Sequence, residues 1–334
     1  MRIGIDAMGG DRAPKAEVQG ALDACASLSA DDKIVLVGDK EIILQHLAGN
    51  DGWEEHIEIY HASQAIGMNE SPVEALRSKP DSSIAVLVKL HKEGMVDACI
   101  SAGNTGAFAA AGQMMLRRLK GVHRPGIAIV TPTPRGPVAL CDVGANVSCR
   151  PAHLYQYGLM ASIYLSAMCD MPDPRVGLLS IGAEEAKGND LVKQTRELFQ
   201  NDSRISFVGN VEGRDLFSGR CDVMICEGFV GNVVLKLMEG LVEGLMKSMF
   251  KELAHALPEQ ASTMQQIGLS TFAKYDFNEY GGAPLLGVNG LCIICHGASN
   301  NRGIMNAVNV VRELAKRHMN ERIVEVLSQG PEGN

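Results

Sequence analysis

The sequence is poor in aromatic residues, which make up 4% of its 334 residues, and in charged residues, which make up 21%. Hydrophobic residues reach 46%, so the chain can bury a sizeable core and does not have a disordered composition. The formal net charge of −8 argues against nucleic acid, which is bound mainly through Lys and Arg. We therefore expect a globular protein that has no nucleic-acid partner.

Long apolar runs are also absent, and none approaches the ~20 residues that a membrane-crossing helix needs. The chain opens directly with a strand-like segment and shows neither the apolar stretch nor the cleavage site of a leader. Nine cysteines form an odd number without secretory features, which predicts reduced thiols. From these absences we expect a cytoplasmic protein.

One cysteine cluster, Cys292-Ile-Ile-Cys295-His296, matches the C-x-x-C-H pattern of covalent haem attachment. The segment is better interpreted as a buried strand, in which residues three apart point to opposite faces. Zinc would need further ligands, and the sequence has no second C-x-x-C. We therefore predict two core cysteines, with no metal and no cofactor.

Strand-like and helix-like segments alternate, which is typical of a largely parallel sheet covered by helices on both faces. Strands are predicted near 2–7, 33–38, 56–60, 96–102, 126–131, 138–142, 175–181, 205–208, 221–226 and 291–295. Helices are predicted over 14–28, 40–48, 71–77, 83–93, 106–119, 151–168, 189–200, 212–217, 230–257, 260–272 and 301–327. No linker divides the chain, so we expect a single domain over 1–327 and a flexible tail at 328–334.

Five of the predicted strands run into loops of glycine, asparagine and acidic residues that are followed by helices. These loops are Met8–Asp11, Gly103–Gly106, Gly182–Asn189, Glu227–Asn232 and His296–Ser299. In an open parallel sheet such loops gather at the carboxyl edge, where ligands bind. Helix N-termini there offer free N–H groups and positive potential, which suit phosphate or another anion. The pattern predicts an anion-handling active site at one edge of the sheet.

The predicted helix over 230–257 has an unusually wide apolar face. Between Val233 and Phe250 its polar residues form one narrow stripe of Lys236, Glu239, Glu243 and Lys247. Such a helix is either central in the core or buried in a subunit interface. Pro258 ends it, so 233–272 is predicted to form a projecting αα-hairpin. We favour a homodimer contact.

Six motifs resemble, in order, those of the bacterial phosphate acyltransferases of phospholipid synthesis, the PlsX family. They are Ile3–Pro14, Ser101–Gly106, Asp142–Asn146, Gly182–Asn189, Gly228–Asn232 and Tyr280–Gly287, and the likeness extends from residue 1 to about 327. Two positions depart from the usual pattern, Glu227 in place of Asp and Ala298 in place of Ser.

The resemblance implies transfer of a fatty acyl group from acyl carrier protein to inorganic phosphate, giving acyl phosphate. It also implies a doubly wound three-layer α/β/α sandwich similar to phosphotransacetylases and isocitrate-type dehydrogenases. The family works as a homodimer without a metal or organic cofactor. Its product would pass to a membrane glycerol-3-phosphate acyltransferase, which favours peripheral membrane contact through the hairpin tip at 253–267.

The same resemblance implies the site residues. The catalytic residues would be Lys187 for phosphate or the oxyanion, Asn232 for the thioester carbonyl, and His296 as an acid or base. Phosphate or substrate contacts are expected at Asp6, Gly9, Gly10, Gly103, Asn104, Thr105, Asn189, Gly231, Gly281 and Gly282. The sequence contains no Gly-x-Ser-x-Gly elbow, so a covalent acyl-enzyme is not indicated.

Plainer roles stay open for several of these residues. Lys187 could be a solvated surface lysine, Asn232 an ordinary helix-start residue, and His296 a loop cap. Asp6 would repel phosphate, so we interpret it as a loop organiser that accepts backbone N–H groups. Asp142 is predicted to stabilise its own turn.

Docking of an acidic carrier on an acidic chain requires a local basic patch. Arg117, Arg118, Lys120 and Arg124 are one such group in the sequence. Arg77 and Lys79 could form a basic approach for an anionic substrate, or simply an ordinary solvated face.

Two other classes compete with the acyltransferase hypothesis. An oxidoreductase would share the implied fold, but no Gly-x-Gly-x-x-Gly follows the first strand. A non-enzymatic binder of acyl carrier protein or lipid would need no phosphate-specific loops.

Thermal denaturation with added ligands separates the acyltransferase from the oxidoreductase. We expect inorganic phosphate to raise the melting temperature, because a ligand that binds only the folded state stabilises it. NAD(P) should leave the melting temperature unchanged, and the reverse pattern would favour the oxidoreductase.

Overall fold

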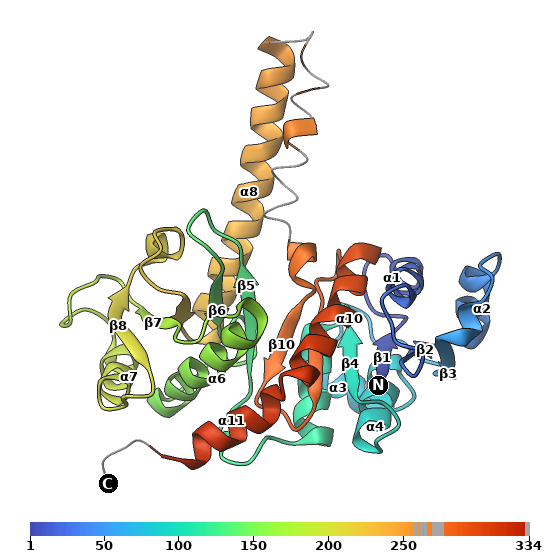
Figure 1. Cartoon of the computed structure of the whole chain (residues 1–334), viewed down its shortest axis with the longest axis horizontal. Helices are drawn as coiled ribbons and strands as arrows, with labels where there is room; N and C mark the ends of the chain where they lie inside the picture. Colours follow the sequence, from blue (N-terminus) through green and yellow to red (C-terminus); the bar gives the residue numbers. More distant parts are fainter. Residues whose placement is uncertain (257–259, 261–262, 264–265, 269–276, 331–334) are drawn as a thin grey trace.

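The computed structural model describes residues 1–256, 260, 263, 266–268 and 277–330 of the chain. Within them, eleven strands form one sheet in the order β3-β2-β1-β4-β11-β10-β5-β6-β9-β7-β8 (Figure 1). The strands are β1 Arg2–Asp6, β2 Lys33–Gly38, β3 Ile57–His61, β4 Ala98–Ser101, β5 Gly126–Thr131, β6 Val138–Cys141, β7 Arg175–Leu179, β8 Ser206–Val211, β9 Val223–Ile225, β10 Ala283–Leu286 and β11 Leu291–Ile294.

The sheet consists of two parallel blocks that run in opposite directions. One block contains β3, β2, β1, β4 and β11, and the other contains β6, β9, β7 and β8. Between the blocks, β10 is antiparallel to both β11 and β5, and β5 is antiparallel to β6. The carboxyl ends of the two blocks therefore lie at opposite edges of the sheet. The prediction of one shared carboxyl edge for all five loops is wrong.

Helices cover both faces, which confirms the predicted layered α/β class. The helices are α1 Lys15–Cys25, α2 Lys40–Leu47, α3 Pro72–Ser78, α4 Ser83–Lys92, α5 Thr105–Ala111, α6 Pro151–Cys169, α7 Asp190–Gln200, α8 Gly228–Ala256, α10 Asn301–Lys316 and α11 Met319–Ser328. One buried cluster includes side chains of α1, α2, α6, α7, α10 and α11, and the other those of α3, α4 and α5. Cys295 belongs to the first cluster and Cys292 to the second, which confirms both as core residues on opposite faces of β11.

The main differences from the predicted elements are a strand that was not predicted and a predicted helix that is divided. β10 was missed because it has only four residues, contains Pro284 and is flanked by glycines, a composition typical of a loop. The predicted helix over 301–327 is two helices, because His318 adopts a left-handed conformation with φ of 51° between them. The predicted helix over 260–272 falls largely outside the described residues.

Helix α8 projects beyond the sheet (Figure 1). Its exposed apolar side chains recur every four residues, at Val233, Leu237, Leu241, Leu245 and Met249, with exposed fractions between 47% and 65%. The alternative of a helix central in the core therefore does not hold for the described chain. None of the helices in this part of the chain is long and apolar enough to cross a membrane.

A buried carboxyl group lies under the loop that follows β1. Glu17 on α1 is 1% exposed. Its Oε1 packs against Gly10, and a Cβ added to Gly10 would lie only 2.8 Å from this oxygen. Its Oε2 has no hydrogen-bond partner among the described residues. Burial raises the pKa of Glu17 from its ordinary value to about 8. The folded protein therefore favours the neutral acid at neutral pH.

The stability of the protein should depend on the pH through Glu17. The folded state holds this proton more tightly than the unfolded chain. The buried carboxyl group therefore does not lower the free energy of unfolding below pH ~4.5, and lowers it increasingly as the pH rises to about 8. The Gln side chain of Glu17→Gln is neutral at every pH. The free energy of unfolding of this variant should therefore exceed that of the parent by an amount that increases over this range, to the order of a few kcal/mol. Chemical denaturation of both proteins at several pH values measures the difference.

The matched control is Glu54→Gln, which changes an exposed carboxylate outside the core. Because that side chain is exposed, its replacement should leave the free energy of unfolding nearly unchanged. A difference between Glu17→Gln and the parent that stays constant from pH 5 to pH 8 would contradict the assignment.

Candidate functional site

The loop after β1 is organised by Asp6. This fully buried carboxylate accepts hydrogen bonds from the backbone N–H of Met8 at 3.1 Å and from the hydroxyl of Ser101 at 2.7 Å. Burial raises the pKa of Asp6, while hydrogen bonds from Ser83 and Ser101 oppose that shift. Asp6 therefore holds the loop from beneath, as predicted for a loop organiser.

Three glycine-rich loops of the first block are packed together. A Cβ on Gly9 would lie 2.7 Å from the backbone nitrogen of Gly103, so only glycine allows this contact. Gly10 has φ of +111°, and the N–H of Asp11 donates to the carbonyl of Gly297 at 2.8 Å. The structure thus joins the loops after β1, β4 and β11.

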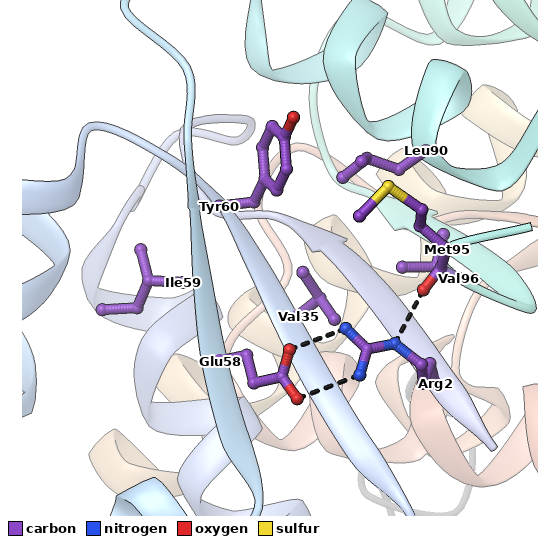
Figure 2. A pocket seen from close by; sticks show the side chains of 8 residues that line it. All are labelled: Arg2, Val35, Glu58, Ile59, Tyr60, Leu90, Met95 and Val96. Carbon is purple, nitrogen blue, oxygen red and sulfur yellow. Dashed lines mark hydrogen bonds and ion pairs between the residues drawn. The ribbon is translucent and has the colours of Figure 1, made fainter. Parts of the chain in front are cut away.

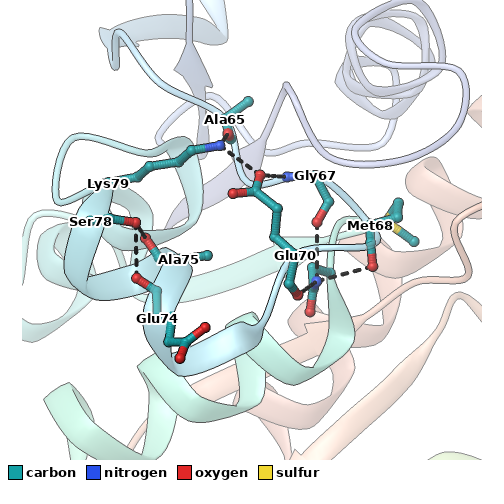
Figure 3. Close-up of polar contacts among 9 residues, drawn as sticks. Ala65, Gly67, Met68, Glu70, Glu74, Ala75, Ser78 and Lys79 are labelled. Carbon is teal, nitrogen blue, oxygen red and sulfur yellow. Dashed lines mark hydrogen bonds and ion pairs between the residues drawn. The ribbon is translucent and has the colours of Figure 1, made fainter.

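Asn104, a predicted phosphate contact, has a structural task. Its Oδ1 caps α5 by accepting from the N–H of Ala107 at 3.0 Å. Its Nδ2 donates to three carbonyls that converge from the segment before α3, those of Gly67, Met68 and Glu70, at 3.1 to 3.2 Å (Figure 3). The neighbouring Thr105 is exposed at the first residue of α5.

The same segment before α3 binds the side chain of Lys79. Its ammonium group pairs with Glu70 at 2.6 Å and donates to the carbonyl of Ala65 at 2.9 Å (Figure 3). Glu70 in turn accepts from the N–H of Gly67. The ammonium group of Lys79 therefore stabilises this loop. Arg77 is exposed to solvent.

In the second block, Asp142 stabilises the turn after β6, as predicted. It is fully buried and accepts five N–H hydrogen bonds between 2.8 and 3.1 Å. The donors are the backbone groups of Ile127, Gly144, Ala145 and Asn146 and the side-chain amide of Asn146. Burial raises the pKa of Asp142, and these hydrogen bonds act in the opposite direction.

Helix α8 begins against this turn. A Cβ on Gly231 would lie 1.8 Å from the carbonyl oxygen of Asp142, so the glycine is required by close packing. Asn232 is exposed and lies beside Gly144. Glu227 accepts from the N–H groups of Phe229 at 2.7 Å and Val230 at 3.0 Å. This carboxylate therefore occupies the helix N-terminus where an anion would otherwise bind.

Lys187 lies in the loop between β7 and α7. It is exposed, and its ammonium group makes no ion pair or hydrogen bond within the described residues. Asn189 caps α7 by accepting from the N–H of Val192 at 3.0 Å. Since Leu178 is in register with Ile225, this loop lies next to the one that leads into α8.

Gly281 and Gly282 are packed inside the protein. A Cβ on Gly281 would meet the backbone of Asn306 on α10 at 2.4 Å, and one on Gly282 would meet Ile293 on β11 at 2.8 Å. Both have positive φ, 65° and 96°. Close packing and backbone conformation account for both glycines.

His296 is contacted by α8, and this contact connects the two blocks. The Nζ of Lys236 lies 2.9 Å from His296 Nε2 and 2.8 Å from Glu239 Oε2. The N–H of Ala298 donates to His296 Nδ1 at 3.1 Å, and His296 Nε2 also lies 3.7 Å from Glu239 Oε2. Burial lowers the pKa of His296, and the charge of Lys236 lowers it further.

Lys236 was not among the predicted site residues, and was placed only in the narrow polar stripe of its helix. The signal that could have found it is its spacing of four residues from Asn232, which places both side chains on one face of α8. Asn232, Lys236 and His296 together offer an amide, a cation and an imidazole at the base of α8.

A cavity of about 90 Å³ lies elsewhere, at the amino ends of β1 and β3 (Figure 2). Its guanidinium group, from Arg2, donates to Glu58 at 2.6 and 3.0 Å and to the carbonyl of Met95 at 2.7 Å. The positive charge of Arg2 is therefore already paired with the carboxylate of Glu58. Among the described residues no group of three or more His, Cys, Asp or Glu could hold a metal ion.

Solved structures with the same fold include a phosphotransacetylase from Streptococcus pyogenes, with a TM-score of 0.63 and 14% identity over 95% of this chain and 94% of that one. A branched-chain phosphotransacylase from Enterococcus faecalis has a TM-score of 0.57 and 12% identity over 93% and 98%. The expected likeness to phosphotransacetylases is confirmed at the level of the fold.

The sequence itself has much closer relatives. The chain is 45% identical to a phosphate acyltransferase of Nitratidesulfovibrio vulgaris, over 99% of this chain and 96% of that protein. A phosphate acyltransferase of Desulforamulus reducens is 47% identical, over 98% and 97%. The model of the family described as fatty acid synthesis protein matches residues 1–322. The chain therefore belongs to the fatty acid synthesis protein family and, within it, to the phosphate acyltransferases.

Proposed function

We propose that this enzyme transfers a fatty acyl group from acyl-acyl carrier protein to inorganic phosphate, giving acyl phosphate for phospholipid synthesis. An oxygen of hydrogen phosphate attacks the thioester carbon, and the carbon–sulfur bond breaks. The phosphate proton ends on the leaving thiolate, so the products are acyl phosphate and the carrier thiol. The observation that carries the proposal is the identity of 43–47% to phosphate acyltransferases over nearly the full chain.

The base of α8 offers suitable groups for each demand of this reaction. Phosphate is an adequate nucleophile once it is oriented, so the enzyme must supply anion binding, approach geometry and oxyanion donors. We assign phosphate binding to Lys187 and Lys236, and the thioester oxyanion to the Asn232 amide. His296, which is neutral at neutral pH because its pKa is lowered, can move the proton from phosphate to the thiolate.

We further propose that residues 1–327 act as one catalytic unit in a homodimer, in the cytoplasm and at the membrane surface. The continuous sheet supports a single unit. The exposed apolar stripe of α8 supports a role for this helix in the dimer contact. Exposed Ile267 and half-buried Leu253 support membrane contact at the 253–267 tip, of which 257–259, 261–262 and 264–265 lie outside the described residues. Hand-off of acyl phosphate to a membrane glycerol-3-phosphate acyltransferase would follow there.

Trapping the product tests the reaction. With acyl-acyl carrier protein, phosphate and hydroxylamine, we expect acyl hydroxamate to form in proportion to the enzyme and only when phosphate is present. A thioester alone reacts slowly with hydroxylamine, and reactions without enzyme provide that background. Equal release of carrier thiol with and without phosphate would instead identify a thioesterase.

Replacing the loop lysine tests its role. Lys187→Ala should lower kcat about 10²- to 10³-fold, the effect of losing one preorganised donor to transition-state charge. The melting temperature should hardly change, because the side chain is exposed and supports no core. Lys193→Ala, an exposed lysine on α7, is the matched control and should keep full turnover. Near-normal turnover of Lys187→Ala would remove this residue from the site.

A further inference from the structure

Five cations without acidic partners gather near the start of α6. Four of them, Arg117, Arg118, Lys120 and Arg124, lie between α5 and β5, and Arg150 immediately precedes α6. All five are exposed, and none forms an ion pair with a carboxylate of the described residues. Elsewhere in this acidic chain, Arg175 and Arg204 are paired with Asp222 and Asp202. We call these five residues the cationic surface.

Three of these cations are connected through two histidines. Arg118 donates a hydrogen bond to the carbonyl of His123, and the His123 ring lies 6.3 Å from that of His153 on α6. Burial lowers the pKa of His153, and the positive charges of Arg124, His123 and Arg150 lower it further. Arg124 and Arg150, which lie on different segments, therefore act on the same imidazole.

The cationic surface adjoins the turn against which α8 begins. Pro125, next to Arg124, accepts a hydrogen bond from Asn146 Nδ2 at 2.7 Å. The carbonyl of Asn146 accepts from the N–H of Gly228 at 2.8 Å, at the first residue of α8. Asn232 follows one helical turn later. A partner bound to the cationic surface would thus have a short route to the base of α8.

We propose that the cationic surface is the docking site for the acyl carrier protein, and this inference rests on the proposed function. A net charge of −8 repels an acidic carrier at long range, so an approach requires a local region of positive potential. Unpaired cations that repel one another in the free enzyme gain partners when an acidic surface binds. Since the surface is exposed, the attraction should weaken as salt screens it.

Charge reversal provides the test. Arg124→Glu combined with Arg150→Glu should weaken binding of the unacylated carrier at least about 10-fold at low salt, measured by isothermal titration calorimetry. The KM for the acylated carrier should rise in parallel, while kcat and the KM for phosphate stay unchanged. Raising the ionic strength should weaken carrier binding strongly for the parent and only slightly for the double variant.

The matched control reverses two exposed lysines on α2 and α4, with Lys40→Glu and Lys92→Glu, and changes the net charge equally. The proposal would be overturned if the control and test variants lost carrier affinity equally, or if neither variant lost any. Loss of binding to anionic phosphatidylglycerol vesicles with unchanged carrier affinity would also overturn it, in favour of a lipid surface. An unchanged kcat at saturating carrier shows that the test variant is folded. Release of carrier thiol by the parent at the same rate with and without phosphate would refute the proposed function instead.

Discussion

One buried carboxylate, Asp142, determines how the second block of strands meets α8. Its two oxygens accept hydrogen bonds from the backbone N–H of Ile127 on β5 and from those of Gly144, Ala145 and Asn146. A buried polar group that loses its partner is costly, so these bonds hold the turn after β6 in one conformation. Gly231 packs on the Asp142 carbonyl, and the turn therefore fixes where α8 starts.

The position of α8 explains how a sheet with two opposed carboxyl edges can present one group of reactive side chains. The helix begins beside Gly144 in the second block, and its Lys236 reaches His296 at the end of β11 in the first. Because Glu227 already satisfies N–H groups at the start of α8, anion binding at its base depends on side chains. Asn232 and Lys236 share the face that supplies them.

Electrostatics in this acidic protein depends on where the charges lie. Asp6 and Asp142, which lie beneath glycine loops, are buried and surrounded by hydrogen-bond donors, so they organise the backbone. Exposed cations lie at Lys187, at the base of α8 and on the cationic surface. An overall negative charge is therefore compatible with anionic substrates and an acidic partner.

The sequence by itself determined the α/β class, the glycine loops and the family, because those signals are local. The helix predicted over 189–200, for example, is α7 Asp190–Gln200, because the pattern of that segment needs no knowledge of the rest of the chain. Tertiary structure alone decided the direction of the two blocks, which depends on the four residues of β10 pairing antiparallel with β11 and with β5, a strand far away in sequence. It also decided the role of Lys236. This residue meets His296 sixty positions later through the packing of α8, and a local pattern carries no information about such a contact.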